Sequence, residues 1–241
     1  MTTYSIFSEI YSEMHARNLS LVQIDNLSID KDLLELSVDR RQGIGLFSFV
    51  SEPLDQNFMI LLEDLKSSFL DQLIYLPKPA LLNTGLIHHT FFQLAKVESS
   101  LTPLIGLNIP DYLDIIKDIL FELGSYTIDL SRIIAVPTGL LMCGYPSKNI
   151  NKYRENIRNR LNKPLDEPYK TNIAHTSILR LASKNVLGSD LVHFVSKYAD
   201  INFGSFNVND LYLGFGTWRM HPSETKMLYR FDLVNKVLSK V

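Results

Sequence analysis

One local pattern occurs twice in this chain, and it constrains the fold more than any other feature. Two apolar segments, residues 86–94 and 173–181, each contain a histidine, a hydroxyl residue two positions later, and then an apolar residue. Both segments are predicted to be β-strands. Each follows a predicted strand, a predicted helix and a loop. Because this order of elements occurs twice, the sequence predicts a mixed α/β chain with an internal pseudo-repeat.

The direction of the side chains gives the repeat a chemical meaning. Side chains alternate between the two faces of a strand, so His88 and Thr90 share one face, as do His175 and Ser177. His89 shares its face with apolar neighbours, and we interpret it as a hydrogen-bonded structural residue. Two such strands meeting across a cleft would place two imidazoles and two hydroxyls around one phosphate. The chemistry that fits this set is phosphodiester cleavage.

At these residues the chain resembles the 2H phosphoesterase superfamily, whose signature is a pair of H-x-[ST]-apolar motifs. Residues 86–91 look like the first motif, and residues 174–180 look like the second, including the arginine that often follows it. The resemblance covers about residues 45–233, and it departs from the family at Ser177, where threonine is commoner. It implies a two-lobed, pseudo-symmetric α+β fold with antiparallel-rich sheets, outer helices and a central cleft. It also implies catalysis without a metal or another cofactor.

Phosphodiester cleavage requires one proton to leave the attacking oxygen and another to reach the leaving oxygen. Imidazole can serve both steps near neutral pH because its ordinary pKa is about 6.5. We expect His88 and His175 to form the acid and base pair, in an order that the sequence leaves open. Thr90 and Ser177 would donate hydrogen bonds to the non-bridging phosphate oxygens.

The expected substrate is a nucleotide or a short RNA, cleaved at a 2′,3′-cyclic phosphate or a 2′-5′ linkage. Three alternatives stay open at this point. The same site could act in reverse as an RNA 2′-5′ ligase, or the chain could be a catalytically inactive nucleotide- or RNA-binding module. The third alternative is a structural or interaction protein built on an enzyme scaffold.

Cationic and aromatic residues near the motifs are candidates for substrate binding. Arg180 belongs to the second motif, although strict alternation places it on the face of Thr176, opposite His175. A cation-rich helix expected over residues 148–161 could attract phosphate or form a solvated face. Four further residues are candidates for substrate binding: Tyr145, Tyr169, Trp218 and Arg219. The three aromatic ones could stack on bases.

Composition limits the environment of the protein. Lys and Arg number 24 against 26 Asp and Glu, so the net charge of -2 gives no long-range attraction to nucleic acid or an anionic membrane. The single cysteine, Cys143, excludes an internal disulfide and a multi-cysteine zinc site, and we interpret it as a buried apolar residue. No apolar segment has the length of a membrane span. We therefore expect a cytoplasmic protein with no membrane partner and no evident obligate protein partner.

The chain shows no linker that would separate flexible domains. We expect residues 43–241 to form one domain with lobes at about 43–125 and 126–241, and residues 1–42 to be an N-terminal extension packed on it. Helices are predicted over 55–70, 110–123, 148–161 and 189–199. Further strands are predicted over 45–50, 127–136, 139–145, 205–215 and 226–233.

Overall fold

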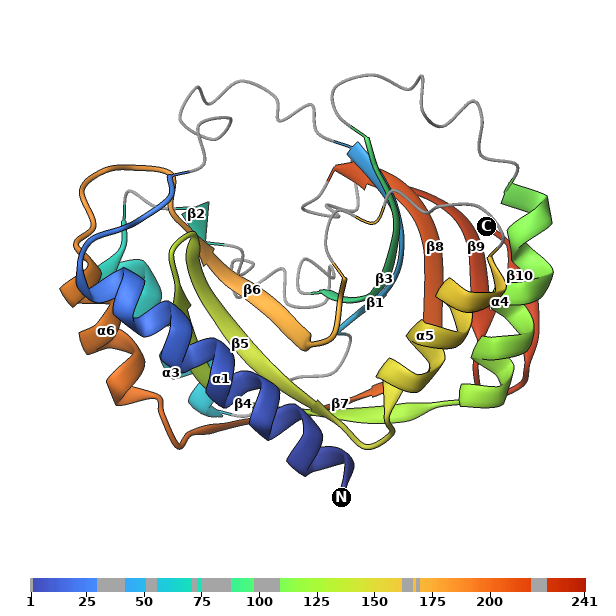
Figure 1. Ribbon diagram of the computed structural model, residues 1–241, viewed down its shortest axis with the longest axis horizontal. Helices are drawn as coiled ribbons and strands as arrows, with labels where there is room; N and C mark the ends of the chain where they lie inside the picture. Colours follow the sequence, from blue (N-terminus) through green and yellow to red (C-terminus); the bar gives the residue numbers. More distant parts are fainter. Residues whose placement is uncertain are drawn as a thin grey trace.

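Two antiparallel sheets that curve toward each other form the framework of the molecule (Figure 1). The computed structural model describes residues 2–29, 42–50, 56–70, 73–74, 88–97, 109–161, 167, 170–217 and 225–241. Sheet A has the strand order β10-β9-β8-β1-β3, and sheet B has the order β2-β6-β5-β4-β7. The mixed α/β, two-lobed architecture expected from the sequence is therefore confirmed.

The strands of sheet A, in chain order, are β1 (Gln42–Phe49), β3 (His88–Val97), β8 (Asp210–Thr217), β9 (Lys226–Asp232) and β10 (Val237–Lys240). The strands of sheet B are β2 (Leu73–Ile74), β4 (Tyr126–Val136), β5 (Gly139–Pro146), β6 (Ala174–Arg180) and β7 (Asn202–Val208). The helices are α1 (Thr3–Gln23), α3 (Gln56–Ser68), α4 (Ile109–Leu123), α5 (Ile150–Arg160) and α6 (Gly188–Lys197).

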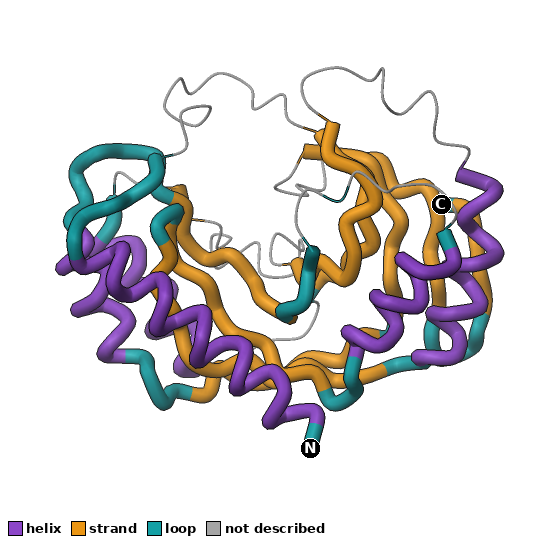
Figure 2. Tube along the Cα trace, viewed as in Figure 1, coloured by secondary structure: helices purple, strands orange, loops and turns teal. Residues whose placement is uncertain are grey.

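The helices lie on the outer side of the sheets, and the strands line the inside (Figure 2). Helices α4 and α5 cover sheet A, while α1, α3 and α6 lie outside sheet B. Each described helix presents an apolar stripe to its sheet because its apolar residues recur at helical spacing. In α4 this stripe is made of Tyr112, Ile116, Ile119, Leu120 and Leu123, all at most 8 % exposed.

Each sheet consequently has one buried face and one open face. In sheet A, Leu46, Leu213 and Phe231 are no more than 1 % exposed and form part of the core under the helices. On the other face, cross-strand neighbours such as Tyr212 and Arg230 are only partly buried. Because side chains alternate along a strand, Tyr212 and Arg230 point away from the face that the helices cover.

The chain changes sheets at Asn209, where one continuous strand over 205–215 was expected. That prediction is wrong, because β7 ends at Val208 on the edge of sheet B and β8 begins at Asp210 inside sheet A. The residues on both sides of Asn209 have strand character, so the pattern gives little sign of the crossing. Since β8, β9 and β10 return to pair with β1, a boundary near residue 125 does not separate the two sheets.

Helix α1 lies in the N-terminal region, residues 1–42, where no helix or strand was predicted. It packs against β4, β5 and α6, and Phe7 and Tyr11 are completely buried there. The Tyr11 hydroxyl accepts hydrogen bonds from the backbone N–H groups of Gly144 (3.2 Å) and Ala174 (3.0 Å). The start of β6 is thus fixed from the outer side of the sheet. Among the described helices, none combines the length and apolar character that crossing a bilayer requires.

Candidate active site

The two histidine strands meet where the two sheets come together. Strand β3 is the last strand of sheet A in the part of the chain that the structure describes, and β6 pairs with the short β2 at Leu179 and Arg180. The two strands lie in contact. The Thr176 hydroxyl of β6 donates a hydrogen bond to the His88 carbonyl oxygen of β3 at 2.9 Å. Each sheet therefore contributes one histidine strand to the same junction.

On both strands the histidine and the hydroxyl residue share the open face. Residues directly opposite each other in an antiparallel pair project to the same side. His88 and Thr90 lie opposite Phe49 and Phe47 of β1. His175 and Ser177 lie opposite Cys143 and Leu141 of β5. All four predicted side chains are partly exposed.

The first histidine strand contains a β-bulge directly after its hydroxyl residue. Thr90 pairs with Phe47 and Phe92 pairs with Leu46, so Phe91 is an extra residue in the ladder. The bulge shifts the alternation by one position. Gln93, opposite Gly45, therefore returns to the face of His88 and Thr90. Sequence reasoning missed this residue because a bulge leaves no recognisable pattern in the sequence.

The second histidine strand has a bulge at the equivalent position. Ser177 pairs with Leu141 and Leu179 pairs with Leu140, which makes Ile178 the extra residue. Arg180 consequently shares the face of His175 and Ser177. The expectation that it lies on the opposite face, with Thr176, is wrong because strict alternation does not hold through the bulge.

His175 is an uncharged imidazole at neutral pH in this environment. Burial is the main cause that lowers its pKa to about 4, and the positive charges of Arg154, His88 and Arg180 lower it further. A neutral imidazole can accept a proton, so this environment suits a general base.

His89 lies on the other side of β3, as expected. It pairs with Ser48, is 2 % exposed and belongs to the side of sheet A that the helices cover. Burial, followed by the charge of Arg154, holds its pKa well below the ordinary value. Its ring nitrogens have no hydrogen-bond partner in the part of the chain that the structure describes, so the hydrogen bonds expected for it are not found.

Aromatic side chains lie beside His88 on sheet A. The ring of Phe47 is 6.4 Å from that of His88, and Phe49 is the cross-strand partner of His88. Phe49 and Tyr212 are 6.1 Å apart and partly exposed. Phe47 and Phe49 occupy alternate positions of β1, which is the signal in the sequence that could have identified them.

The aromatic residues proposed from the sequence have other positions. Tyr145 is 5 % exposed and stacks on Tyr4 of α1 at 4.7 Å, so it offers little surface to a ligand. Its role in substrate binding stays a prediction. Tyr169, Trp218 and Arg219 lie outside the described residues.

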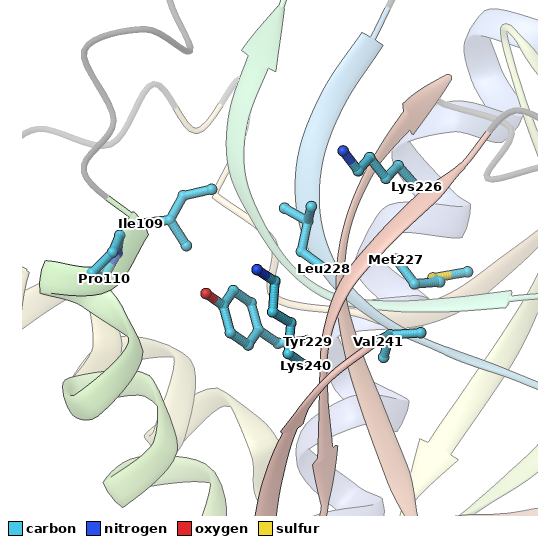
Figure 3. A pocket seen from close by; sticks show the side chains of 8 residues that line it. All are labelled: Ile109, Pro110, Lys226, Met227, Leu228, Tyr229, Lys240 and Val241. Carbon is cyan, nitrogen blue, oxygen red and sulfur yellow. The ribbon is translucent and has the colours of Figure 1, made fainter.

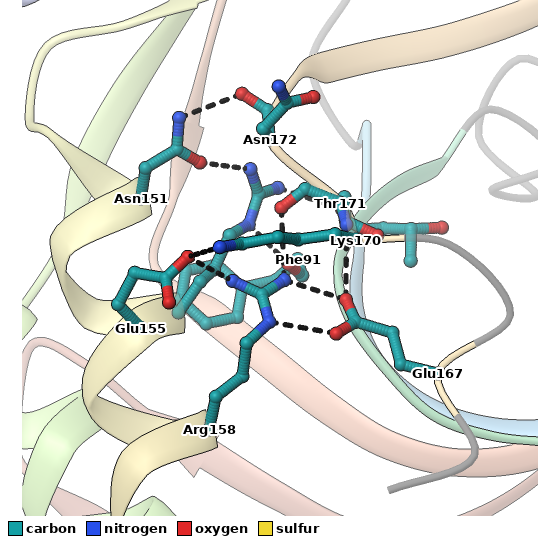
Figure 4. Close-up of polar contacts among 10 residues, drawn as sticks. Phe91, Asn151, Glu155, Arg158, Glu167, Lys170, Thr171 and Asn172 are labelled. Atoms are coloured by element: carbon teal, nitrogen blue, oxygen red, sulfur yellow. Dashed lines mark hydrogen bonds and ion pairs between the residues drawn. The ribbon is translucent and has the colours of Figure 1, made fainter.

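The cations of α5 mainly hold the helix to its surroundings. Lys148 donates to the Leu123 carbonyl oxygen (2.6 Å), and Arg158 forms an ion pair with Glu167 (2.7 Å). Arg154 is completely buried. The contacts of Arg158 with Glu155 and Glu167 appear in Figure 4. Lys163, a further cation that follows this helix in the sequence, lies outside the described residues.

Cys143 is completely buried opposite His175, as the sequence indicated. Burial raises the pKa of its thiol to about 12, so it stays protonated and is unsuited to act as a nucleophile. Over the described ranges, no three His, Cys, Asp or Glu side chains lie together in a way that could hold a metal ion.

A pocket of about 390 Å³ lies between the start of α4 and the strands β9 and β10 (Figure 3). Tyr229, which lines it, is the cross-strand partner of Leu213 and therefore points away from Tyr212 and the open face. This pocket lies on the side of sheet A opposite His88. It is separate from the histidine pair.

Comparison with known proteins finds structural similarity alone. No protein-family model and no curated protein matches the chain. Among solved structures, it is similar to TT0787 of Thermus thermophilus, with 15 % identity and a TM-score of 0.47 over 80 % of this chain and 97 % of that one. A structure described as a phosphoesterase has 14 % identity and a TM-score of 0.42 over 80 % and 99 % of the two chains. Apo E. coli LigT has 13 % identity and a TM-score of 0.37 over 80 % and 99 %.

Proposed function

We propose that this protein is a 2H-type phosphodiesterase that cleaves a nucleotide or RNA phosphodiester without a metal ion. The observation that carries the proposal is the matched pair of histidine and hydroxyl side chains on the open faces of β3 and β6. The hydrogen bond from Thr176 to the His88 carbonyl holds these strands together. One phosphate lying between the strands would meet two proton carriers and two hydrogen-bond donors.

His175 acts as the general base in this proposal. Its neutral form takes a proton from the attacking water, or from a ribose hydroxyl where the ribose attacks. His88 gives a proton to the oxygen that leaves phosphorus. For a 2′,3′-cyclic phosphate, water forms one P–O bond, one ring P–O bond breaks, and the product is a phosphomonoester. A bound phosphodiester anion favours a protonated imidazole beside it, which suits the role of His88.

Thr90 and Ser177 stabilise the transition state. Each hydroxyl lies two residues after its histidine on the same face, so both can donate to non-bridging phosphate oxygens. Charge grows on these oxygens during the reaction, and fixed donors stabilise it without needing to reorient. Arg180, which the bulge turns toward this face, adds a positive charge near the anion.

The substrate we propose carries a base. Phe49 and Tyr212 offer partly exposed rings beside His88, and a base stacked on an aromatic side chain is typically stabilised by about 1–3 kcal/mol. The net charge of -2 gives no general attraction to long nucleic acids, so local contacts must hold the ligand. These features favour a cyclic nucleotide or a short 2′-5′-linked oligonucleotide.

The proposal is tested by incubating the purified protein with cyclic mononucleotides, cyclic dinucleotides, and 2′-5′ and 3′-5′ oligonucleotides, with and without a chelator. We expect cleavage of at least one substrate at the same rate in both conditions. Activity that disappears with the chelator and returns with a divalent cation would contradict the metal-independent reaction. Tight binding without turnover of any substrate would favour a binding module instead.

The direction of the reaction is tested separately. The protein is incubated with one RNA that ends in a 2′,3′-cyclic phosphate and another that begins with a 5′-hydroxyl. We expect the cyclic end to open to a monoester, with no joined product. Accumulation of the joined RNA would show that the site acts as a ligase.

A further inference from the structure

Arg154, in the middle of α5, is a fully buried cation. Within the described part of the chain, no carboxylate forms an ion pair with it. Its guanidinium instead donates to three neutral oxygens. Burying a charge without an opposite charge costs free energy, which these hydrogen bonds must offset.

Two of these oxygens belong to the first histidine strand. Arg154 Nε donates to the Phe91 carbonyl oxygen at 2.6 Å, and Nη2 donates to the Thr90 carbonyl oxygen at 3.3 Å. The guanidinium carbon lies 5.5 Å from the centre of the Phe91 ring. Because β3 is an edge strand with a bulge at Phe91, these carbonyls lie where the sheet ladder is incomplete. Arg154 supplies the hydrogen bonds at that point.

The same helix holds the chain that leads into the second histidine strand. Arg158 binds both carboxylate oxygens of Glu167 (2.8 and 2.7 Å), and its Nη2 also donates to the Thr171 carbonyl oxygen at 3.2 Å (Figure 4). Asn151 accepts from Arg154 Nη1 at 2.7 Å and donates to the Asn172 carbonyl oxygen at 2.7 Å. Helix α5 therefore links β3 to the segment that leads into β6.

We propose that Arg154 is a positioning residue for the reaction proposed above. It holds Thr90 and the bulge of β3 in place through its two hydrogen bonds to that strand. The inference rests on the proposed function for its catalytic part, whereas an accompanying electrostatic part, the effect of its charge on His175, can be tested in the free protein.

The charged groups around His175 support the electrostatic part. After burial, the causes that lower the pKa of His175 are Arg154 from α5, His88 from β3 and Arg180 from β6. Arg154 is the largest of these charges in its effect, and unlike an imidazole it stays protonated throughout the neutral range. The other titratable groups nearby are kept neutral at pH 7 by burial: His89, Cys143 and Tyr11.

Three variants separate the charge of Arg154 from its hydrogen bonds. Arg154→Met removes both, Arg154→Lys keeps the charge but loses the planar set of donors, and Arg160→Met is the matched control. Arg160 lies on the same helix, is half exposed, and faces Asp118 at 3.9 Å. The imidazole resonances of His175 are followed by NMR between pH 7 and pH 5, and hydrolysis of a cleaved nucleotide is measured on the same samples.

In the wild-type protein and in Arg160→Met, the His175 resonance should stay constant over this range, because its pKa is about 4. In Arg154→Met its midpoint should rise by about one pH unit, so the resonance begins to move above pH 5. The kcat should fall about 10²-fold in Arg154→Met and about tenfold in Arg154→Lys, with KM changed far less, because misplacing Thr90 acts on the transition state.

An unchanged His175 titration in Arg154→Met would overturn the electrostatic part, and an unchanged kcat would overturn the positioning part. If Arg154→Met does not fold, the kcat of Arg154→Lys tests the positioning role instead. A wild-type kcat in that variant would refute this role. If the wild-type protein cleaves nothing, the proposed function fails, while the titration still tests the charge of Arg154.

Discussion

The two histidine strands have the same backbone design but different surroundings. Each carries a histidine, a hydroxyl residue, a bulge and a second polar residue on its open face, and equivalent residues are 87 positions apart, as in His88 and His175. His88 lies beside the aromatic side chains of β1 and β8. The pKa of His175 is lowered first by burial and then by the charges of Arg154, His88 and Arg180.

A repeated backbone can therefore hold two chemically distinct imidazoles. The repeat fixes where each histidine points, because the register and the bulge are the same in both strands. The non-repeated neighbours fix the charge, because burial and the cations keep His175 neutral. This difference is the reason why we propose His175 as the base and His88 as the acid. The following predictions test that division of roles.

Replacing either histidine should have the largest effect. His88→Ala and His175→Ala should each reduce kcat/KM for the cleaved nucleotide by about 10²- to 10⁴-fold, because each removes one proton carrier. The acidic limb of the pH–rate profile should disappear in His175→Ala, and the alkaline limb in His88→Ala. The control is His193→Ala, which removes an exposed imidazole on α6. Near wild-type cleavage by either His88→Ala or His175→Ala would contradict the claim that both histidines carry protons in the reaction.

The two hydroxyls should have similar effects, since they occupy equivalent positions. Thr90→Val and Ser177→Ala should each lower kcat by about 10²-fold, the usual loss when one donor to a developing oxyanion is removed. Ser205→Ala, an exposed serine on β7, serves as the control. Steady-state kinetics measure the effect. A loss in only one of the two strands would show that the phosphate lies against a single sheet.

Acid should destabilise the protein through its neutral histidines. His175 and His89 have lowered pKa values when folded, so the unfolded chain binds more protons below its ordinary histidine pKa of about 6.5. The contribution of these histidines to the free energy of unfolding is therefore fully present above a pH of about 6.5. It falls as the pH drops below that value, by about 1.4 kcal/mol per pH unit for each histidine. Urea unfolding at pH 7, 6 and 5 measures this slope.

His175→Ala should make that slope shallower, since one of the two contributing groups is gone. The matched variant is again His193→Ala, which should keep the wild-type slope. Identical slopes in all three proteins would show that the environment of His175 does not disfavour its charge.

Gln93 should have the smallest effect, confined to binding. Its amide shares the face of His88 and Thr90 but lies beyond both along β3. We expect Gln93→Ala to raise KM for a short oligonucleotide about three- to tenfold, as for one lost hydrogen bond, and to leave a cyclic mononucleotide unaffected. Gln23→Ala, at the exposed end of α1, is the control. Equal effects on both substrates would place Gln93 at the reacting phosphate.

The sequence predicted the parts of the molecule that depend on local periodicity. The helices near α4, α5 and α6 and the shared faces of His88 with Thr90 and of His175 with Ser177 follow from spacing alone. The face on which Arg180 lies could not be predicted from spacing, because a bulge inserts one residue without a sequence signal. In the sequence, Arg154 is one of several cations of a predicted helix. Its burial could not be predicted, because it depends on how α5 packs against β3. The strand crossing at Asn209 likewise depends on tertiary contacts.

The most direct test of the central claim is an NMR titration of the ¹³C-labelled imidazoles with a nucleoside 2′-phosphate. The resonances are assigned with the His88→Ala and His175→Ala variants. We predict that His88 and His175 shift together, with one midpoint and saturation at one equivalent of ligand, while His193 stays unchanged. A ligand that shifts only one of the two imidazoles, or shifts them with separate midpoints, would contradict the claim that both histidines contact one anion.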